Sequence, residues 1–288
     1  MTKLDKYFDR LMNEYYSVLI NAWSDSVKES ARFAIKELAN LPKNKRADEQ
    51  FLSSLEYVIR QQLGDEFAYS LDQKVKIFCE RSYMLASLEP QFINIKIGFN
   101  ATDMKSIEMA KKQQVFWLKN HYDSNVSQRL QEILSNTMQN QWTNGQLAEN
   151  LQTHFSDILK GGKSYFQGLA EHTGLRVREF GRVNSYKKTG AKYYQIVAVI
   201  DDRTSDICRA LDGKIYPVEP AVECMNAMFE VSDNYDFDEA KERLKRIAPF
   251  VTEDQIIYTN GMPSGVSGEH VPFPPFHWRC RTRTVKYG

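Results

Sequence analysis

The residues best suited to chemistry lie in the segment PPFHWRC, which runs from Pro274 to Cys280. Two residues separate His277 from Cys280, and this spacing lets an imidazole and a thiolate turn toward one metal ion. The two prolines before the pair restrict the backbone, which lowers the entropy lost on coordination. Zinc in structural sites prefers about four ligands. Residues from elsewhere in the chain must therefore complete such a site.

Cys208 is the strongest candidate for a third ligand, and Asp201 is our choice for the fourth. Three other residues compete for the fourth position, namely Asp202, Cys224 and His270. The predicted metal site thus comprises Cys208, His277, Cys280 and Asp201, with zinc as the expected ion. One alternative is that Cys208 is a small buried hydrophobe and that His277 is a hydrogen-bonded residue that holds a loop. A nucleophilic Cys208–His277 pair is another, although no third group or oxyanion donor can be identified.

Basic residues cluster in the second half of the chain, although the formal net charge is only +1. Arg178 and Arg182 lie four residues apart, and therefore on one face of a helix, and Lys187 and Lys188 follow them. These four residues are the predicted contacts to DNA phosphate, with binding that is independent of sequence and sensitive to salt. The alternative is a solvated face that pairs with the acidic segment 219–242 or with a partner chain.

Helices are expected over most of the first half of the chain. Apolar residues recur three or four positions apart from residue 1 to about residue 155, which is typical of amphipathic helices. The first such stripe is rich in aromatic residues and comprises Phe8, Leu11, Tyr15, Leu19 and Trp23. We expect this stripe to dock against another protein, and the alternative is that it belongs entirely to the internal core.

Composition changes after Lys160, where strand signals appear. Residues 161–188 predict a helix that opens with two glycines, and TGAKYYQIVAVID predicts a strand over 193–200. The segment 236–250 predicts a further helix that ends before its proline, and the Gly- and Pro-rich stretch 259–275 predicts a long loop. The alternating residues of CRTRTVKY predict a last strand.

These elements predict the α+β fold class, with a mainly helical region over 1–155 and a small α+β domain with a short sheet over 160–288. We expect the strand at Tyr193–Ile200 and the C-terminal strand to share a sheet. That arrangement would bring Cys208 close to His277.

Several functional classes find no support in the sequence. The letters GGKS at 161–164 resemble the end of a phosphate-binding loop, but Asp157 stands where that motif requires glycine. No convincing acid–base pair is present, so we do not expect an enzyme. No apolar run approaches the roughly 20 residues of a membrane span, and the N-terminal segment shows no secretory signal. We therefore expect no membrane partner, and we expect synthesis in a cytosol that keeps the four cysteines reduced.

Two segments, IDDRTSDICRALDGKIYP and PPFHWRCRT, together resemble the signature of the phage Mu F-like head-morphogenesis family, whose members are also called minor head proteins. In that family an Asp-x-Arg-Thr-x-x-x-Cys segment leads into a turn with glycine, and a Pro-Pro-x-His-x-x-Cys-Arg segment closes the domain. The resemblance covers about residues 160–288. The matching residues are Asp201, Arg203, Thr204, Cys208, Gly213, Pro274, Pro275, His277, Cys280 and Arg281.

The resemblance implies a virion component that is made in the cytoplasm of a host bacterium and lies at the portal vertex or the inner capsid. It implies a role in head assembly, DNA packaging or DNA delivery during genome ejection. Portal, capsid and scaffold proteins are the implied partners, together with packaged DNA. The alternative is a toxin-like or injected enzyme built on the same domain, because similar domains also occur beside toxin modules.

Overall fold

The computed structural model describes residues 3–46, 48–92, 101–122, 126–234, 239, 242–244, 251–268 and 273–288. The chain forms two compact units. Unit 1 comprises Met1–Asn13, Lys76–Gln113 and Ala170–Gly288, and unit 2 comprises Glu14–Val75 and Gln114–Leu169. The boundary at about residue 155 stays a prediction, because these units are defined by contacts in space and each draws on both sides of that point.

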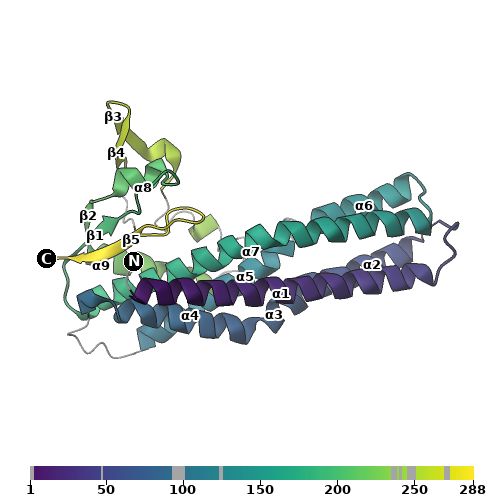
Figure 1. Cartoon of the computed structure of the whole chain (residues 1–288), viewed down its shortest axis with the longest axis horizontal. Helices are drawn as coiled ribbons and strands as arrows, with labels where there is room; N and C mark the ends of the chain where they lie inside the picture. Colours follow the sequence, from purple (N-terminus) through teal and green to yellow (C-terminus); the bar gives the residue numbers. More distant parts are fainter. Residues whose placement is uncertain are drawn as a thin grey trace. The chain divides into compact units, whose positions relative to one another are not determined.

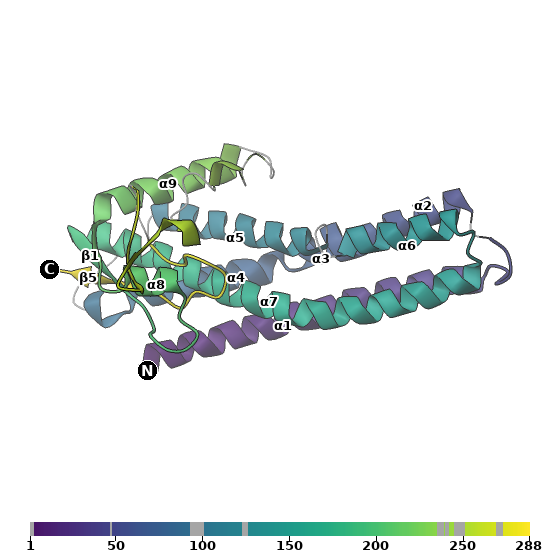
Figure 2. The same ribbon diagram turned by 90° about the horizontal axis from the view of Figure 1, so that it is seen from above.

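Helices dominate the described chain, and short strands form two small sheets (Figures 1 and 2). The helical elements are α1 (Lys3–Ala39), α2 (Glu49–Arg60), the π-helical turn η1 (Gln61–Asp65), α3 (Glu66–Ser70), α4 (Asp72–Ser87), the 3-10 turn η2 (Pro90–Phe92), α5 (Ala101–Tyr122), α6 (Gln128–Gln139), α7 (Asn144–Lys188), α8 (Asp206–Leu211), α9 (Val218–Asn234) and the 3-10 turn η4 (Glu253–Gln255). The strands are β1 (Tyr193–Val197), β2 (Ile215–Pro217), β3 (Ile256–Thr259), β4 (Met262–Val266) and β5 (Arg283–Tyr287). The predicted α+β class is confirmed. Within the described residues, no helix has the length and apolar character needed to span a bilayer.

Unit 2 is built from helices around an aromatic core. Trp23 of α1 lies with its ring centroid 5.0 Å from that of Phe67 of α3 and 5.3 Å from that of Phe166 of α7. All three side chains are buried. The other members of the predicted α1 stripe are buried as well, Tyr15 and Leu19 in unit 2 and Phe8 and Leu11 in unit 1. The interpretation of the stripe as internal core is therefore confirmed, and its use as a docking surface is corrected.

Helix α7 runs without interruption through Gly161 and Gly162, where the sequence predicted that a helix opens. A Cβ atom at Gly162 would lie 2.4 Å from Nε1 of Trp23, whereas a Cβ atom at Gly161 would meet nothing within 4 Å. Gly162 therefore lets α7 approach the buried indole closely. The GGKS letters belong to a helix interior and not to a phosphate-binding loop.

The three-stranded sheet of unit 1 has the order β2-β1-β5, and all its strands are antiparallel. In its register Gln195 lies opposite Val285, which confirms that the two predicted strands share a sheet. Side chains cover the outer edge of β5, because the backbone N–H of Thr284 donates to Glu179 and that of Lys286 donates to Gln91. This edge is therefore closed to pairing with another chain.

The predicted loop over 259–275 is wrong in its first part, where β3 and β4 form a hairpin. Asn260 and Gly261 link the two strands with φ angles of 53° and 76°. An Asn-Gly pair with positive φ is the usual two-residue hairpin connection. Because the stretch is rich in glycine and proline, it was predicted to be irregular, and its Asn-Gly turn signal was missed. The predicted helix over 236–250 lies largely outside the described residues.

The two adjacent glycines of α7 provide a matched test of this packing. We expect Gly162→Ala to lower the free energy of unfolding by about 1–3 kcal/mol, because the new methyl group overlaps an indole held between two phenylalanines. Gly161→Ala should raise it by up to about 1 kcal/mol, because alanine is the better helix former. Urea unfolding followed by circular dichroism measures both, and equal stabilisation by the two changes would contradict the close approach.

Candidate metal centre

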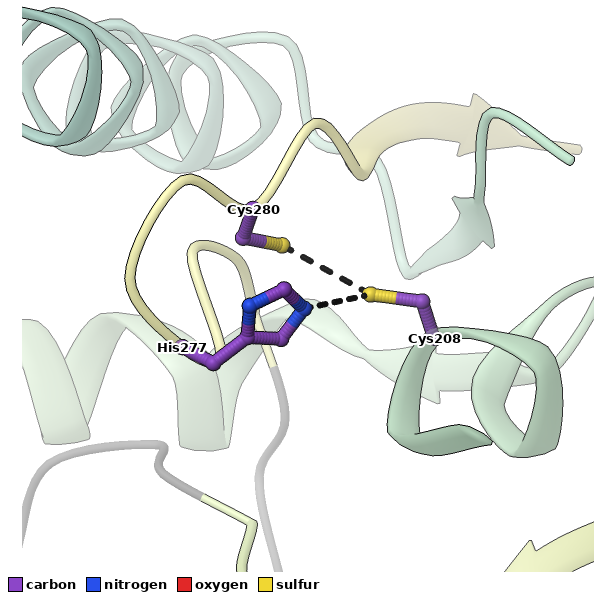
Figure 3. Close-up of side chains that lie close together, drawn as sticks. All are labelled: Cys208, His277 and Cys280. Carbon is purple, nitrogen blue, oxygen red and sulfur yellow. Dashed lines mark hydrogen bonds between the residues drawn. The ribbon is translucent and has the colours of Figure 1, made fainter. Parts of the chain in front are cut away.

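Three side chains of the predicted site meet in unit 1, as Figure 3 shows. Cys208 comes from α8, while His277 and Cys280 come from the segment that precedes β5. The Sγ atom of Cys208 lies 3.2 Å from Nε2 of His277 and 3.7 Å from Sγ of Cys280. The three ligand atoms all lie within 4.8 Å of one another. The prediction that Cys208 and His277 lie close together is confirmed.

Local hydrogen bonds hold each of these side chains in place. Ser205 caps the N-terminus of α8, where its Oγ atom accepts a hydrogen bond from the backbone N–H of Cys208. The same Oγ atom lies 2.9 Å from Nε2 of His277. The backbone N–H of Cys280 donates to the carbonyl of His277, which closes the His-x-x-Cys segment into a turn. Both halves of the centre therefore have a fixed backbone.

The orientation of the His277 ring makes Nε2 the nitrogen available to a metal. Its Nδ1 atom lies 2.9 Å from the carbonyl oxygen of Trp278. A carbonyl oxygen can only accept, so Nδ1 carries the proton in that hydrogen bond. Histidine ligands are commonly oriented in this way, with one nitrogen bound to the backbone and the other to the ion.

The proton balance of the centre favours a thiolate at Cys280. The hydrogen bond from Cys208 and the neighbouring His277 lower the pKa of Cys280 to about 4, although burial opposes the shift. The hydrogen bond to Cys280 and burial raise the pKa of Cys208. The hydrogen bond with Cys280 also raises the pKa of His277. A thiolate is the form of cysteine that binds metals, so the lowered pKa favours metal binding at Cys280.

Asp201, the predicted fourth ligand, has a different partner. Its carboxylate accepts two hydrogen bonds from the guanidinium group of Arg281, at 2.8 Å and 2.6 Å. These bonds lower the pKa of Asp201 and raise that of Arg281. Asp201 is not among the three residues whose ligand atoms converge. The assignment of Asp201 to the metal is therefore corrected to a bidentate ion pair.

This ion pair belongs to a hydrogen-bonded network that the sequence did not reveal. We call it the clasp, and its residues are Val199, Asp201, Thr204, Arg209 and Arg281. The hydroxyl of Thr204 donates to the carbonyl of Val199 and accepts from the backbone N–H of Asp201. The guanidinium group of Arg209 donates to the carbonyl of Asp201. The Asp-x-Arg-Thr turn is thereby joined to Arg281, the residue that follows Cys280. The sequence did carry a signal for this pairing, because the signature contains an acid, Asp201, and a base, Arg281.

Two of the other candidates for a fourth ligand, Asp202 and Cys224, do not join the group. Asp202 is exposed, and Cys224 lies in α9 with its pKa raised to about 11, chiefly by burial. His270 lies outside the described residues. In the part of the chain that the structure describes, the candidate centre thus has three ligands.

The arginines predicted to contact DNA are inside the protein. Arg178 and Arg182 are 5% and 1% exposed, respectively. Both donate to the carboxylate of Glu89, at 2.9 Å and 2.5 Å. Arg182 also pairs with Glu179, whose carboxylate accepts from the Thr284 hydroxyl. The prediction of DNA contacts at these arginines is corrected, because internal carboxylates occupy both guanidinium groups.

The two lysines that follow have different surroundings. The Nζ atom of Lys188 lies 2.5 Å from a carboxylate oxygen of Asp103, and its side chain is largely buried. Lys187 is exposed, and its contact with DNA stays a prediction. The four basic residues therefore form no common phosphate-binding face.

The chain belongs to the family described as phage Mu protein F like protein, whose model matches residues 131–285. It is thus a member of a phage head-morphogenesis family. The match begins within α6, earlier in the chain than residue 160, where the resemblance based on the two signature segments began. It includes both of those segments. No curated protein and no solved structure matches the chain.

The buried ion pairs make a sharp prediction about stability. We expect Arg182→Ala to lower the free energy of unfolding by about 3–5 kcal/mol, because it leaves Glu89 and Glu179 buried without their shared cation. Lys187→Ala, at an exposed position of the same helix, should change it by no more than about 0.5 kcal/mol. Denaturant unfolding measures both values.

A second variant keeps the test informative if Arg182→Ala does not fold. The pair Arg182→Met with Glu179→Gln removes a cation and an anion together and leaves Glu89 paired with Arg178, so it should recover part of the lost stability. A loss below about 1 kcal/mol for Arg182→Ala would show that the network contributes little.

Proposed function

We propose that this protein is a minor head protein that acts at the portal vertex or the inner capsid in head assembly, DNA packaging or DNA delivery. One observation supports the proposal above all: within the family match, the two halves of the signature close on one another. Asp201 binds Arg281, and Cys208 meets His277 and Cys280. The proposed partners are portal, capsid and scaffold proteins, and the proposed location is the virion.

In this proposal Cys208, His277 and Cys280 hold a zinc ion. Their donor atoms, two sulfurs and an imidazole nitrogen, are of the types that zinc binds in proteins. Two thiolates on one tetrahedral zinc, each at about 2.3 Å, lie about 3.8 Å apart. The Sγ atoms of Cys208 and Cys280 are 3.7 Å apart. The spacing of the sulfurs therefore suits a shared ion without rearrangement of the backbone.

The ion would act as a cross-link between segments that are distant in sequence. Cys208 and Cys280 are separated by 72 positions, and both are buried. A bound zinc would join α8 to the segment before β5, and its binding energy would add to the stability of the fold. No carboxylate belongs to the group of converging ligands among the described residues. Three protein ligands alone would leave an open position that suits catalysis, whereas a fourth ligand would close the site. We favour the closed, structural version because, in the described chain, no carboxylate that could act as a general base converges with the ligands, and both this choice and the lack of enzymatic activity stay predictions.

Zinc content tests the centre directly. Protein purified without a histidine tag should contain about one zinc ion per chain, as measured by inductively coupled plasma mass spectrometry. Cys208→Ser and His277→Ala should lose the ion, while Cys224→Ser and Asp201→Asn should keep it, because neither belongs to the converging group. Removal of zinc by a chelator should lower the melting temperature of the wild-type protein and leave the Cys208→Ser variant unaffected.

One result would overturn the zinc assignment, and another would change the ligand set. Less than about a tenth of an equivalent of any transition metal in well-folded protein would reduce the three residues to hydrogen-bonded packing. Loss of zinc in Asp201→Asn, with zinc retained in Cys224→Ser, would return Asp201 to the ligand set.

The role in the head has a separate test in the phage or prophage that encodes the chain. Mass spectrometry of purified particles should find the protein in few copies per particle, together with the portal protein. Deletion of its gene should yield particles with reduced infectivity, and the wild-type gene supplied in trans should restore it. Particles of normal composition and infectivity without the protein would contradict the proposal, and growth arrest of host cells that express it would favour the toxin-like alternative.

A further inference from the structure

Two loops of unit 2 lie side by side, and hydrogen bonds hold them together. Residues 40–46 follow α1 and residues 140–143 connect α6 to α7; we call them the paired loops (Figure 1). The backbone N–H of Asn144 donates to the carbonyl of Lys45, and that of Gly145 donates to the carbonyl of Lys43. The side-chain amide of Asn144 donates to the carbonyl of Pro42, and Arg46 and Thr143 form a β-bridge. The backbone of residues 42–46 is thus held in one conformation.

The paired loops present three cations to solvent. Lys43, Lys45 and Arg46 are exposed, and none of them pairs with a carboxylate in the described chain. Three exposed cations elsewhere in unit 2 differ in this respect. Lys28, Arg129 and Lys160 each lie within 4.0 Å of an acid three positions away, in the pairs Lys28–Asp25, Arg129–Glu132 and Lys160–Asp157. Arg32, Lys36, Arg60, Lys74 and Lys163 are exposed as well, but they are spread along helices, whereas the paired loops place three cations within four positions.

Carboxylates are missing from both segments that form this surface. Residues 38–47 and 133–148 contain no Asp or Glu, although the chain has 37 in total. Their polar side chains are chiefly amides and hydroxyls. The nearest acid after the first loop is Asp48, whose carboxylate accepts from the backbone N–H groups of Gln50 and Phe51 at the start of α2. The cations of the paired loops therefore keep their charge available for an external anion.

We propose that the paired loops bind the phosphate backbone of duplex DNA, independently of its sequence. Lysine, arginine and amide side chains are the groups that proteins use to contact phosphate and sugar. A duplex presents about one negative charge per 1.7 Å of its axis, so it can meet three cations on one short loop at once. A rigid backbone beneath these cations reduces the entropy that binding costs.

An acidic protein is the competing occupant, and the surface fits it less well. Interfaces between proteins are built around a central apolar patch that binding removes from water. The described residues of the paired loops include no exposed large hydrophobic side chain. The inference goes beyond the proposed function, because it rests on this surface and requires neither the zinc ion nor the role in the head.

Fluorescence anisotropy with a labelled duplex of about 24 base pairs tests the proposal on the full chain. The triple variant Lys43→Gln, Lys45→Gln and Arg46→Gln should bind at least about tenfold more weakly than wild type in about 50 mM salt. The slope of log affinity against log salt should become less steep by about 2.7, because each lost phosphate contact removes about 0.9.

The matched control is the triple variant Lys28→Gln, Arg129→Gln and Lys160→Gln, which changes the net charge of the same unit by the same amount. Its affinity and salt slope should equal those of wild type, because these cations already pair with neighbouring acids. Equal weakening by the two triple variants would overturn the proposal, as would the absence of wild-type binding in about 50 mM salt. Polyglutamate that competes as well as unlabelled DNA would assign the surface to an acidic protein, and tighter binding of an RNA hairpin of equal charge would assign it to RNA.

Discussion

The buried guanidinium group of Arg182 is the charge on which the arrangement of unit 1 depends. It lies between the carboxylates of Glu89 and Glu179, and removal of three charged groups from water is costly unless they meet in good geometry. Burial alone would raise the pKa of Glu89, but Arg182 and Arg178 outweigh it and lower that pKa. Glu179 also accepts from the hydroxyl and the backbone N–H of Thr284. The network therefore fixes β5 against α7, and β5 follows directly on the segment that contains His277 and Cys280.

The geometry of the candidate metal centre depends on the position of β5, which the ion-pair network holds. Arg281 lies two residues before β5 and binds Asp201 in the turn that precedes α8. Ser205 then caps α8 and sets the direction of Cys208. The signature thus contains two kinds of residue. Asp201 and Arg281 of the clasp align the two segments, and Cys208, His277 and Cys280 place their ligand atoms together. An ion at that point would strengthen a contact that hydrogen bonds and an ion pair already specify.

Positive charge has opposite roles in the two units. In unit 1, Arg178 and Arg182 of α7 are internal cations that neutralise buried carboxylates, and they cannot meet an external phosphate without disrupting these ion pairs. In unit 2 the cations of residues 43–46 lie on a loop whose neighbours have no carboxylates. Both sets are clusters of Lys and Arg in the sequence. Only the positions of the acids in space distinguish a structural cation from one that is available to a partner.

Several features followed from the amino-acid sequence because they depend on local periodicity or on neighbouring residues. The amphipathic stripe of α1, the strand at β1, the strand at β5 and the His-x-x-Cys turn are of this kind. The convergence of Cys208 on that turn was also predicted, from the expected ligand set, from the sheet that the two strands were expected to share, and from the resemblance of the two segments to one signature. Tertiary structure decided the rest, because it determines which charges share a low-dielectric interior. Arg178 and Arg182 were assigned to DNA and lie in the core, Asp201 was assigned to a metal and binds Arg281, and Gly162 lies against Trp23 from a helix more than a hundred residues earlier. A carboxylate partner that lies 80 or 93 positions away leaves no periodic pattern in the sequence, so only the tertiary structure shows which acid each arginine pairs with.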